Sequence, residues 1–448
     1  MTAEGYASRG HEAAVRDLVA WLAAGIPHAI LVTGPPRVGK TTLALDLAAA
    51  LLCEGPAGER PCRACRGCRR VASGNHPDLH VLRPEGPGEQ VRIGDHDDPE
   101  PGTVRHLVRE LSLLPAEAAF RVAIVESAHR MNEDAQNALL RTLEEPPPGT
   151  VIVLCADDED RLLPTIRSRC LRIRLGPVGT PAIEDLLASR GIADAPTAAR
   201  LARLAGGRPG LAVALARDPE TVRTSGALCR RLLDLADAGP GARLEAASSL
   251  LGEAKAIARA LADPDGAAAE TPGGGTGGKR AASRGRGART PAGRDDAADA
   301  PRTAASAGAS STMADVDVTG DGASADASAA GESEEEAAGG PARRDPPSER
   351  RQAARSLIDT WRIVARDVAV AGVGGRRELR DPSLLEESTA LADRLPAGAM
   401  TRFLERLDVA ERLIEANASP ELAVDTLLLA WPRPATPPAA SEHTVSSR

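Results

Sequence analysis

The sequence predicts an α/β domain with a parallel sheet, followed by an all-helical region. Short apolar runs rich in branched residues, such as Ala29–Thr33 and Thr150–Ala156, recur in residues 1–176 and alternate with segments of helical periodicity. This alternation is typical of parallel strands that are buried on both faces and connected by helices. After residue 176 the strand-like runs end, and Ala- and Leu-rich segments with helical spacing continue.

A phosphate-binding loop follows the first predicted strand. Gly34–Thr41 fits the pattern G-x-x-x-x-G-K-[ST] at every fixed position, and a predicted helix at Thr41–Leu52 follows it. Such a strand, loop and helix direct backbone N–H groups and a helix N-terminus at one point, which favours an anion. Lys40 would reach the outer phosphates of a nucleotide, and the Thr41 hydroxyl would hold Mg²⁺. Since the chain has only three lysines among 55 basic residues, a lysine at this position argues against the alternative, an ordinary turn before a core helix.

The composition restricts the function classes. A net charge of −8 argues against a protein that coats DNA by itself, and three Trp, two Phe and one Tyr are too few for a base-stacking platform. No apolar run approaches the ~18–20 residues that span a bilayer, and the N-terminus lacks a basic segment followed by a hydrophobic one. We expect a cytoplasmic protein without membrane contact, whose seven cysteines are metal ligands or core residues rather than disulfides.

Four cysteines follow the phosphate-loop helix in the spacing C-x8-C-x2-C-x2-C: Cys53, Cys62, Cys65 and Cys68. Four thiolates so close in sequence can form a tetrahedral Zn²⁺ site, and a segment with so few apolar residues needs a metal to hold its shape. We expect a structural site, because four sulfur ligands leave no open position for a substrate. Free thiols or a redox pair remain the alternatives.

The other predicted elements continue the α/β pattern. Apolar residues at helical spacing predict helices, and apolar runs predict strands. The predicted helices span 10–24, 103–114 and 132–143, and the further strands span 76–82 and 171–175. His76 and His80 lie near the cysteines, but an isolated pair at a strand edge is interpreted as structural rather than as a second metal site.

The predicted strand that starts at Arg121 ends in an acid, Glu126. P-loop NTPases hold Mg²⁺ through an acidic residue at the end of this strand. In ATPases that use an acid pair, a following glutamate polarises the attacking water, but here Ser127 follows, and a serine hydroxyl is a poor base at neutral pH. We therefore expect the hydrolytic half of the site to be lost. Glu126 either approaches Mg²⁺ through its longer side chain or is only a polar strand end.

Two blocks carry a resemblance to a known family. Asn137–Pro147 reads NALLRTLEEPP, and Thr165–Cys170 reads TIRSRC. Both resemble the clamp-loader branch of AAA+ proteins. The cysteine spacing, the segment His76–Leu79 and the missing acid pair resemble the delta-prime family of bacterial DNA polymerase III subunits more than the gamma/tau family. The matching blocks run through most of residues 10–217 and recur near the C-terminus.

The resemblance implies a domain order. The first domain is an AAA+ P-loop domain (1–176) with a zinc module at 53–68. A helical lid (177–217) and an all-α collar domain (218–261 and 351–432) follow it. Residues 262–350 interrupt the collar with Gly, Ala, Ser, Asp and Arg, and almost no large apolar residue. Such a segment cannot bury enough surface to offset chain entropy, so we expect it to be disordered. Its basic stretch either contacts DNA or is a solvated tether, and the tail at 433–448 is expected to be flexible.

The resemblance also implies residue roles. Arg169 would act in trans as an arginine finger on nucleotide held by a neighbouring gamma/tau subunit, where its guanidinium stabilises phosphoryl-transfer charge. Without the family motif it would be an ordinary surface arginine. Arg208 falls where the family has a second sensor arginine, with a solvated arginine as the alternative, and Asp157 is a weaker sensor candidate. The expected nucleotide-binding residues are Gly34, Pro35, Val38, Gly39, Lys40, Thr41, Thr42, Glu126 and Arg208.

The function implied is that of a delta-prime-like clamp-loader subunit within the DNA polymerase III holoenzyme. Its partners would be the gamma/tau and delta subunits, the sliding clamp and, through the complex, primed DNA. Its own ATPase activity would be weak or absent. The alternative is a self-sufficient AAA+ ATPase, which the complete phosphate loop favours and Ser127 disfavours.

Overall fold

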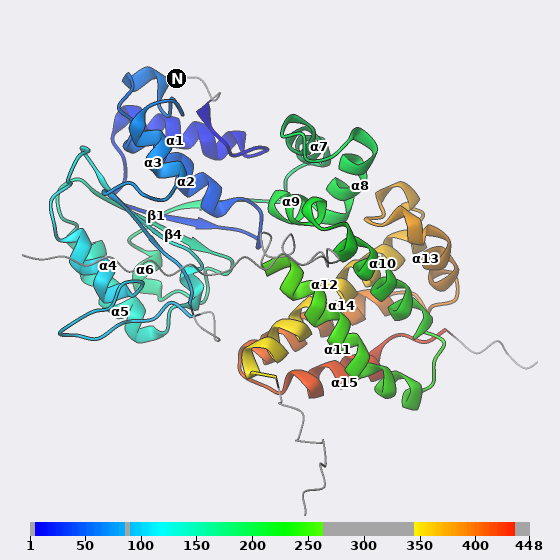
Figure 1. Ribbon diagram of the computed structural model, residues 1–448. Coiled ribbons are helices and arrows are strands. Elements are labelled where there is room, and N and C mark those ends of the chain that lie inside the picture. Colours follow the sequence, from blue (N-terminus) through cyan, green and yellow to red (C-terminus); the bar gives the residue numbers. More distant parts are fainter. Residues whose placement is uncertain (1–4, 86–89, 263–344, 435–448) are drawn as a thin grey trace, which may run out of the picture. The chain divides into compact units, whose positions relative to one another are not determined.

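The computed structural model describes residues 5–85, 90–262 and 345–434 (Figure 1). The first part of the chain forms a five-stranded sheet with the order β2-β3-β4-β1-β5. All its strand pairs are parallel, and the register places Leu31 beside Leu154 on one side and Arg172 on the other. The strands are β1 (Ala29–Thr33), β2 (Leu79–Leu82), β3 (Arg121–Val125), β4 (Thr150–Ala156) and β5 (Leu171–Arg174).

Helices cover both faces of this sheet, so that every residue of β1, β3 and β4 is buried. Alternate residues of β1 serve different cores: Ile30 packs with Leu18 and Leu47 on one face, and Leu31 packs with Leu107 and Leu139 on the other. The first face carries α1 (Glu12–Ala24) and α2 (Lys40–Leu51), and the second carries α4 (Val104–Leu111), α5 (Glu133–Glu144) and α6 (Pro164–Arg167). The predicted α/β class with a parallel sheet is confirmed.

The segment after β5 forms three helices with a small core of their own. They are α7 (Thr180–Ser189), α8 (Ala195–Ala205) and α9 (Pro209–Arg217). Ile183, Leu187, Leu201 and Ala212 are buried between them. Gly207, with φ +83°, ends the turn between α8 and α9, and a Cβ there would lie 2.5 Å from Pro177 Cβ, so only glycine fits.

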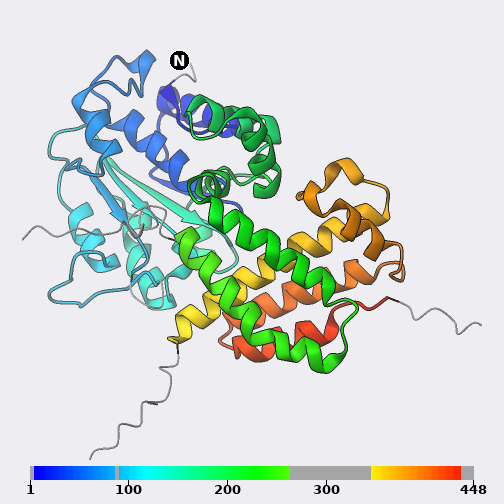
Figure 2. The ribbon, with the colours of Figure 1, turned by 45° about the vertical axis from the view of Figure 1, so that its right-hand side comes forward.

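The last helices share a second all-helical core, seen from a second direction in Figure 2. They are α10 (Pro219–Asp234), α11 (Pro240–Ala262), α12 (Pro347–Gly372), α13 (Leu385–Ala392), α14 (Ala399–Glu415) and α15 (Pro420–Ala430). Trp361, Phe403 and Trp431 meet at its centre with ring centroids 4.7–5.7 Å apart. Arg243, fully buried on α11, donates to the carbonyls of Leu428 and Trp431 and thereby ties α11 to the end of α15.

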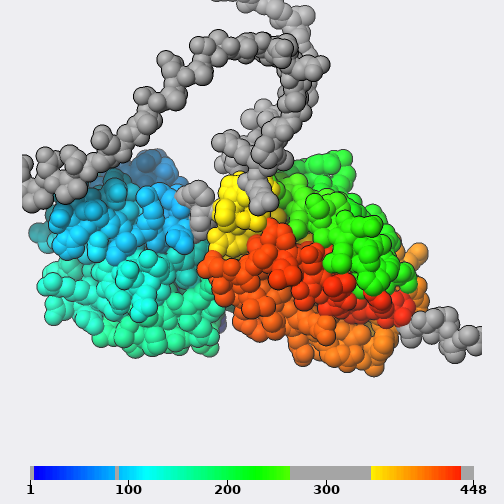
Figure 3. Space-filling model, turned by 90° about the horizontal axis from the view of Figure 1, so that it is seen from below, coloured from blue at the N-terminus to red at the C-terminus, as the bar shows by residue number. Residues whose placement is uncertain are grey.

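The structure differs from the sequence predictions at some boundaries. The predicted disordered segment 262–350 lies mostly outside the described residues, but α12 already begins at Pro347. Its start is held by ion pairs of Glu349 with Lys255 (3.0 Å) and of Arg350 with Glu421 (2.8 Å). In Figure 3 this start of α12 (yellow) lies against the C-terminal helices (orange to red). The short helices α3 (Arg66–Ala72), α6 and α13 were not predicted.

The predicted boundaries between lid and collar remain predictions, although separate hydrophobic cores are described for the two helical regions. The predicted tail at 433–448 lies almost entirely outside the described residues. Cys155, Cys170 and Cys229 are buried and unpaired. Within the described ranges no helix has the length and apolar character to cross a membrane.

Candidate functional site

The phosphate loop connects β1 directly to α2, as the motif predicts. Both fixed glycines have backbone conformations that other residues rarely adopt: φ is +148° at Gly34 and +114° at Gly39. A Cβ on Gly34 would lie 2.3 Å from the Leu175 carbonyl oxygen. The loop therefore requires glycine at these positions, and the N-terminus of α2 opens towards the space that the loop encloses.

A cavity of about 440 Å³ lies over the loop. This is the size of a small-molecule site, and the loop provides one wall while the segment before α1 provides another. Residues of α7 and α9 and the ends of β3 and β4 complete it. The lining residues are Ala7, Ser8, Arg9, His11, Pro36–Thr42, Glu126, Ser127, Cys155, Asp157, Leu186, Arg190, Pro209, Gly210 and Val213.

The Lys40 ammonium is fully engaged within the site. Its Nζ donates to the carbonyls of Gly34 (2.8 Å) and Pro35 (2.7 Å). It also forms an ion pair of 2.6 Å with Asp157, and only 8% of the lysine side chain is exposed. Because of this ion pair Asp157, which follows β4, is the counterion of the phosphate-loop lysine. A phosphate group entering this cavity must compete with Asp157 for Lys40.

Both ring nitrogens of His129 face Asp157. The Asp157 N–H donates to His129 Nδ1 at 3.1 Å, and His129 Nε2 lies 3.6 Å from the Asp157 carboxylate. Burial lowers the pKa of His129 to about 4, although Asp157 opposes the shift. The imidazole is therefore neutral at pH 7, and the Asp157 charge is balanced by Lys40. His129 was not predicted as a site residue, and its one signal in the sequence is its place shortly after the strand-end acid.

The strand-end acid has a partner outside the cavity. Glu126 accepts a hydrogen bond from Arg83 Nε at 3.2 Å. Ser127 follows in the left-handed conformation, with φ +51°. Among the described residues that line the cavity, the carboxylates are Glu126 and Asp157, and the latter is engaged by Lys40. A carboxylate that could activate water is thus not provided at position 127.

The structure brings together Val38–Thr42 and Glu126 in one cavity, while Gly34 and Pro35 contribute carbonyls to Lys40. Arg208 is not part of that lining. It lies at a second cavity of about 150 Å³, together with Arg37, and its Nε donates to the Ala205 carbonyl at 3.1 Å.

Arg169 also lies outside the cavity lining, directly after α6. Its Nη2 pairs with Glu144 at 2.6 Å, and its Nη1 donates to the Thr165 carbonyl at 3.0 Å. About a third of the side chain is exposed, 35%. The guanidinium is therefore held at the surface by the end of α5 and is accessible to another molecule.

The four cysteines form one cluster, and among the described residues it is the one group of close His, Cys, Asp or Glu side chains with the geometry of a metal site. All four Sγ atoms lie within 4.8 Å of one another, with Cys53 Sγ 3.5 Å from Cys62 Sγ and 3.9 Å from Cys65 Sγ. A tetrahedral Zn²⁺ with Zn–S distances of about 2.3 Å requires sulfurs roughly 3.8 Å apart. Backbone N–H groups around Cys62 lower the pKa of its thiol to about 6, whereas burial raises the pKa of the Cys53 and Cys68 thiols. The positions of the four sulfurs fit a zinc ion.

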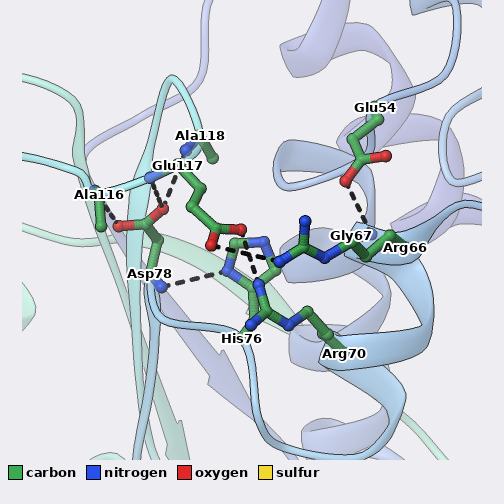
Figure 4. A network of polar contacts seen from close by, with 9 residues as sticks. All are labelled: Glu54, Arg66, Gly67, Arg70, His76, Asp78, Ala116, Glu117 and Ala118. Carbon is green, nitrogen blue, oxygen red and sulfur yellow. Dashed lines mark hydrogen bonds and ion pairs between the residues drawn. The ribbon is translucent and has the colours of Figure 1, made fainter.

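A polar network docks this cysteine module on the sheet domain (Figure 4). On α3, Arg70 pairs with Glu117 at 2.7 Å and Arg66 with the same carboxylate at 3.6 Å. The loop of Glu117 is held in turn by buried Asp78, which accepts the N–H groups of residues 116, 117 and 118 at 2.5–2.9 Å. His76 Nδ1 accepts from the Asp78 N–H at 3.1 Å. His76 thus takes part in this network, and the structural interpretation of His76 and His80 stays a prediction.

Comparisons with known proteins agree with the motifs. Residues 10–179 match the family described as "DNA polymerase III, delta subunit". The chain is 39% identical over 184 residues to the DNA polymerase III subunit delta' of Pseudomonas aeruginosa, covering 41% of this chain and 53% of that protein. It is 37% identical over 196 residues to the Bacillus subtilis delta' subunit (44% and 55%) and 32% identical over 197 residues to the Escherichia coli tau subunit (43% and 29%). The chain thus spans about half the length of the delta' relatives.

Proposed function

We propose, from the premise that residues 10–179 are those of a DNA polymerase III delta-prime relative, that this chain is a delta-prime-like subunit of a bacterial clamp loader. In that role it helps gamma/tau and delta subunits to load the sliding clamp onto primed DNA in the cytoplasm. The chain binds ATP weakly or statically and does not hydrolyse it efficiently.

One observation carries the proposal: a complete phosphate loop opens into a cavity in which position 127 is a serine. Phosphate binding needs the backbone of the loop, whereas hydrolysis needs a group that activates water. The loop backbone is present, and the group that activates water is missing from its usual place at position 127. Lys40 is also engaged by Asp157, so that nucleotide binding must displace an ion pair.

Arg169 is proposed as the residue through which this chain contributes to ATP hydrolysis at the site of a neighbouring gamma/tau subunit. Its guanidinium lies at the surface and outside the lining of the chain's own cavity, which supports a role on nucleotide held by another subunit. Release from Glu144 requires the exchange of one carboxylate for the phosphates of that nucleotide. An arginine delivered in this way stabilises charge on the transferred phosphoryl group.

The cysteine module is proposed to hold one structural Zn²⁺ through Cys53, Cys62, Cys65 and Cys68. Their sulfur distances suit tetrahedral coordination. Metal analysis of the purified chain should find one zinc per molecule. A folded protein without bound metal would refute the site.

The test of the function compares the isolated chain with a reconstituted complex. ATP should bind to the isolated chain, more tightly with Mg²⁺ than without, and turnover should be negligible. Added gamma/tau and delta subunits should form a complex that loads the clamp onto primed DNA only when this chain is present. Robust hydrolysis by the isolated chain, lost in Lys40→Ala, would instead establish the alternative of a self-sufficient ATPase.

A further inference from the structure

We propose that Arg63 of the cysteine module couples metal binding to the shape of the nucleotide cavity. It does so through the chain segment Gly5–Arg9, here called the N-terminal strap. The inference rests on the proposed ATP and zinc sites, and it adds that the two sites influence each other. Arg63 acts through its neighbours and is a positioning residue.

The N-terminal strap forms a wall of the cavity, since Ala7, Ser8 and Arg9 line it. A single carboxylate holds this wall in place. Asp46, on α2 and 1% exposed, accepts the N–H groups of Ala7 (3.0 Å) and Ser8 (2.8 Å) and the Ser8 hydroxyl (2.6 Å). Because Asp46 belongs to the helix that starts at Lys40, these bonds tie the wall to the phosphate-loop helix.

Arg63 supplies the positive charge for Asp46. Its Nη2 forms an ion pair with Asp46, and its Nε donates to the Gly5 carbonyl at 2.7 Å. The strap also packs on the module without any side chain between them, because a Cβ on Gly5 would lie 2.1 Å from the Pro61 carbonyl oxygen. The strap is therefore bound on one side by α2 and on the other by residues 61–63.

Arg63 lies between two of the zinc-type cysteines. It has a left-handed backbone conformation, with φ +57°, in the turn from Cys62 to Cys65. For a residue other than glycine this conformation costs free energy and persists only where the surroundings hold it. A metal bound by Cys62 and Cys65 fixes both ends of the turn, so metal binding orients Arg63 towards Asp46 and Gly5.

Loss of the metal frees this turn and leaves Asp46 as a buried carboxylate without its cation. Such a group is costly, so the strap and its hydrogen bonds to Asp46 should loosen. The wall of the nucleotide cavity would then have to be ordered when ATP binds, which lowers affinity. Because coupling between two binding sites is reciprocal, ATP should tighten metal binding by the same factor.

The experiment compares Arg63→Ala with Arg70→Ala in the full chain. Arg63 lies in the module and Arg70 lies on α3, just after the last cysteine; both side chains are 33% exposed, but Arg70 pairs with Glu117 and not with Asp46. Hydrogen exchange of peptides that cover residues 5–9 should be faster in Arg63→Ala and unchanged in Arg70→Ala. ATP affinity, measured by calorimetry with Mg²⁺, should fall at least about fivefold in Arg63→Ala only, the lower end of typical couplings.

A second measurement uses the native chain, so its result does not depend on whether a variant folds. Zinc is withdrawn by a chelator in the presence and absence of ATP, and ATP should raise zinc affinity by the same factor by which zinc raises ATP affinity. If the native chain binds ATP but its zinc affinity ignores ATP, or if Arg63→Ala binds ATP as the native chain does, the coupling is refuted. A native chain that binds no ATP would refute the proposed nucleotide site itself, while the exchange of residues 5–9 still reports on Arg63.

Discussion

The two halves of the cavity over the phosphate loop differ in what they require from the sequence. The phosphate-loop half is made of backbone, and its geometry depends on Gly34 and Gly39, both at positive φ. The other half, at the ends of β3 and β4, depends on the side chains of Glu126, Ser127 and Asp157. In the first half every fixed position is kept, whereas in the second a serine stands where an activating carboxylate is needed.

Under the proposed function, this difference separates phosphate binding from hydrolysis within one fold. Backbone N–H groups can bind an anion with no reactive side chain nearby. Hydrolysis also requires a base or water-positioning group and charge stabilisation at the transferred phosphoryl. Arg169, the arginine-finger candidate that the motifs identify, lies outside the cavity lining, as does the sensor candidate Arg208. Three substitutions test this division of labour, from the largest expected effect to the smallest.

The largest effect is expected from Arg169→Ala. Hydrolysis at the neighbouring subunit's site should fall by about 10³-fold or more, because arginine fingers contribute that much to phosphoryl transfer. The measurement is single-turnover hydrolysis by a reconstituted complex in which only the neighbouring subunit has an intact phosphate loop. Arg169→Lys should recover only part of the rate, because an ammonium lacks the planar fork of a guanidinium.

The matched control for the finger is Arg172→Ala. Arg172 lies on β5 close to Arg169, is 41% exposed and pairs with Glu159 at 3.8 Å. Its loss removes a similar charge and should leave hydrolysis and assembly unchanged. Equal hydrolysis rates in the native and Arg169→Ala complexes would refute the arginine-finger role. The group that stabilises charge would then have to lie within the cavity itself.

Lys40→Ala tests the binding half. ATP affinity should fall by about 100-fold, because truncating a buried charge that binds an anion costs roughly 2–5 kcal/mol. The loss also leaves the Asp157 carboxylate to repel the phosphates. Calorimetric titration with ATP and Mg²⁺ measures the change, and Lys255→Ala, which removes a lysine on α11, is the control. Unchanged affinity in Lys40→Ala would place the nucleotide elsewhere.

Local patterns explain how much of this arrangement was predictable. The buried strands have continuous apolar runs, the phosphate loop has fixed glycines, and the zinc-type cysteines lie close in sequence, so each could be recognised without contacts across the fold. The pairing of Lys40 with Asp157 and that of Asp46 with Arg63 join separate segments and leave no periodic signal. The same holds for Arg243, a charged residue on α11 whose burial depends on carbonyls at the end of α15.

Asp157→Asn tests whether the two halves of the cavity are joined at Lys40, and its effect should be the smallest. The amide keeps the shape but removes the charge that occupies the ammonium, so ATP should bind about three- to tenfold more tightly. A larger gain is not expected, because Asp157 is 33% exposed and solvent screens the 2.6 Å pair. The same change should lower the melting temperature of the ATP-free protein, since Lys40 then keeps only two carbonyl partners.

Asp158→Asn is the matched control, because it removes the same charge one residue away, where the carboxylate accepts the N–H of Asp160 at 2.9 Å. It should change neither ATP affinity nor the melting temperature by a comparable amount. Tighter ATP binding in Asp157→Asn alone would identify the ion pair as the contact that keeps affinity low in the free chain. Weaker binding would give Asp157 the opposite role, that of a residue which positions Lys40 or Mg²⁺ for the nucleotide, and the two halves would then act together rather than against each other.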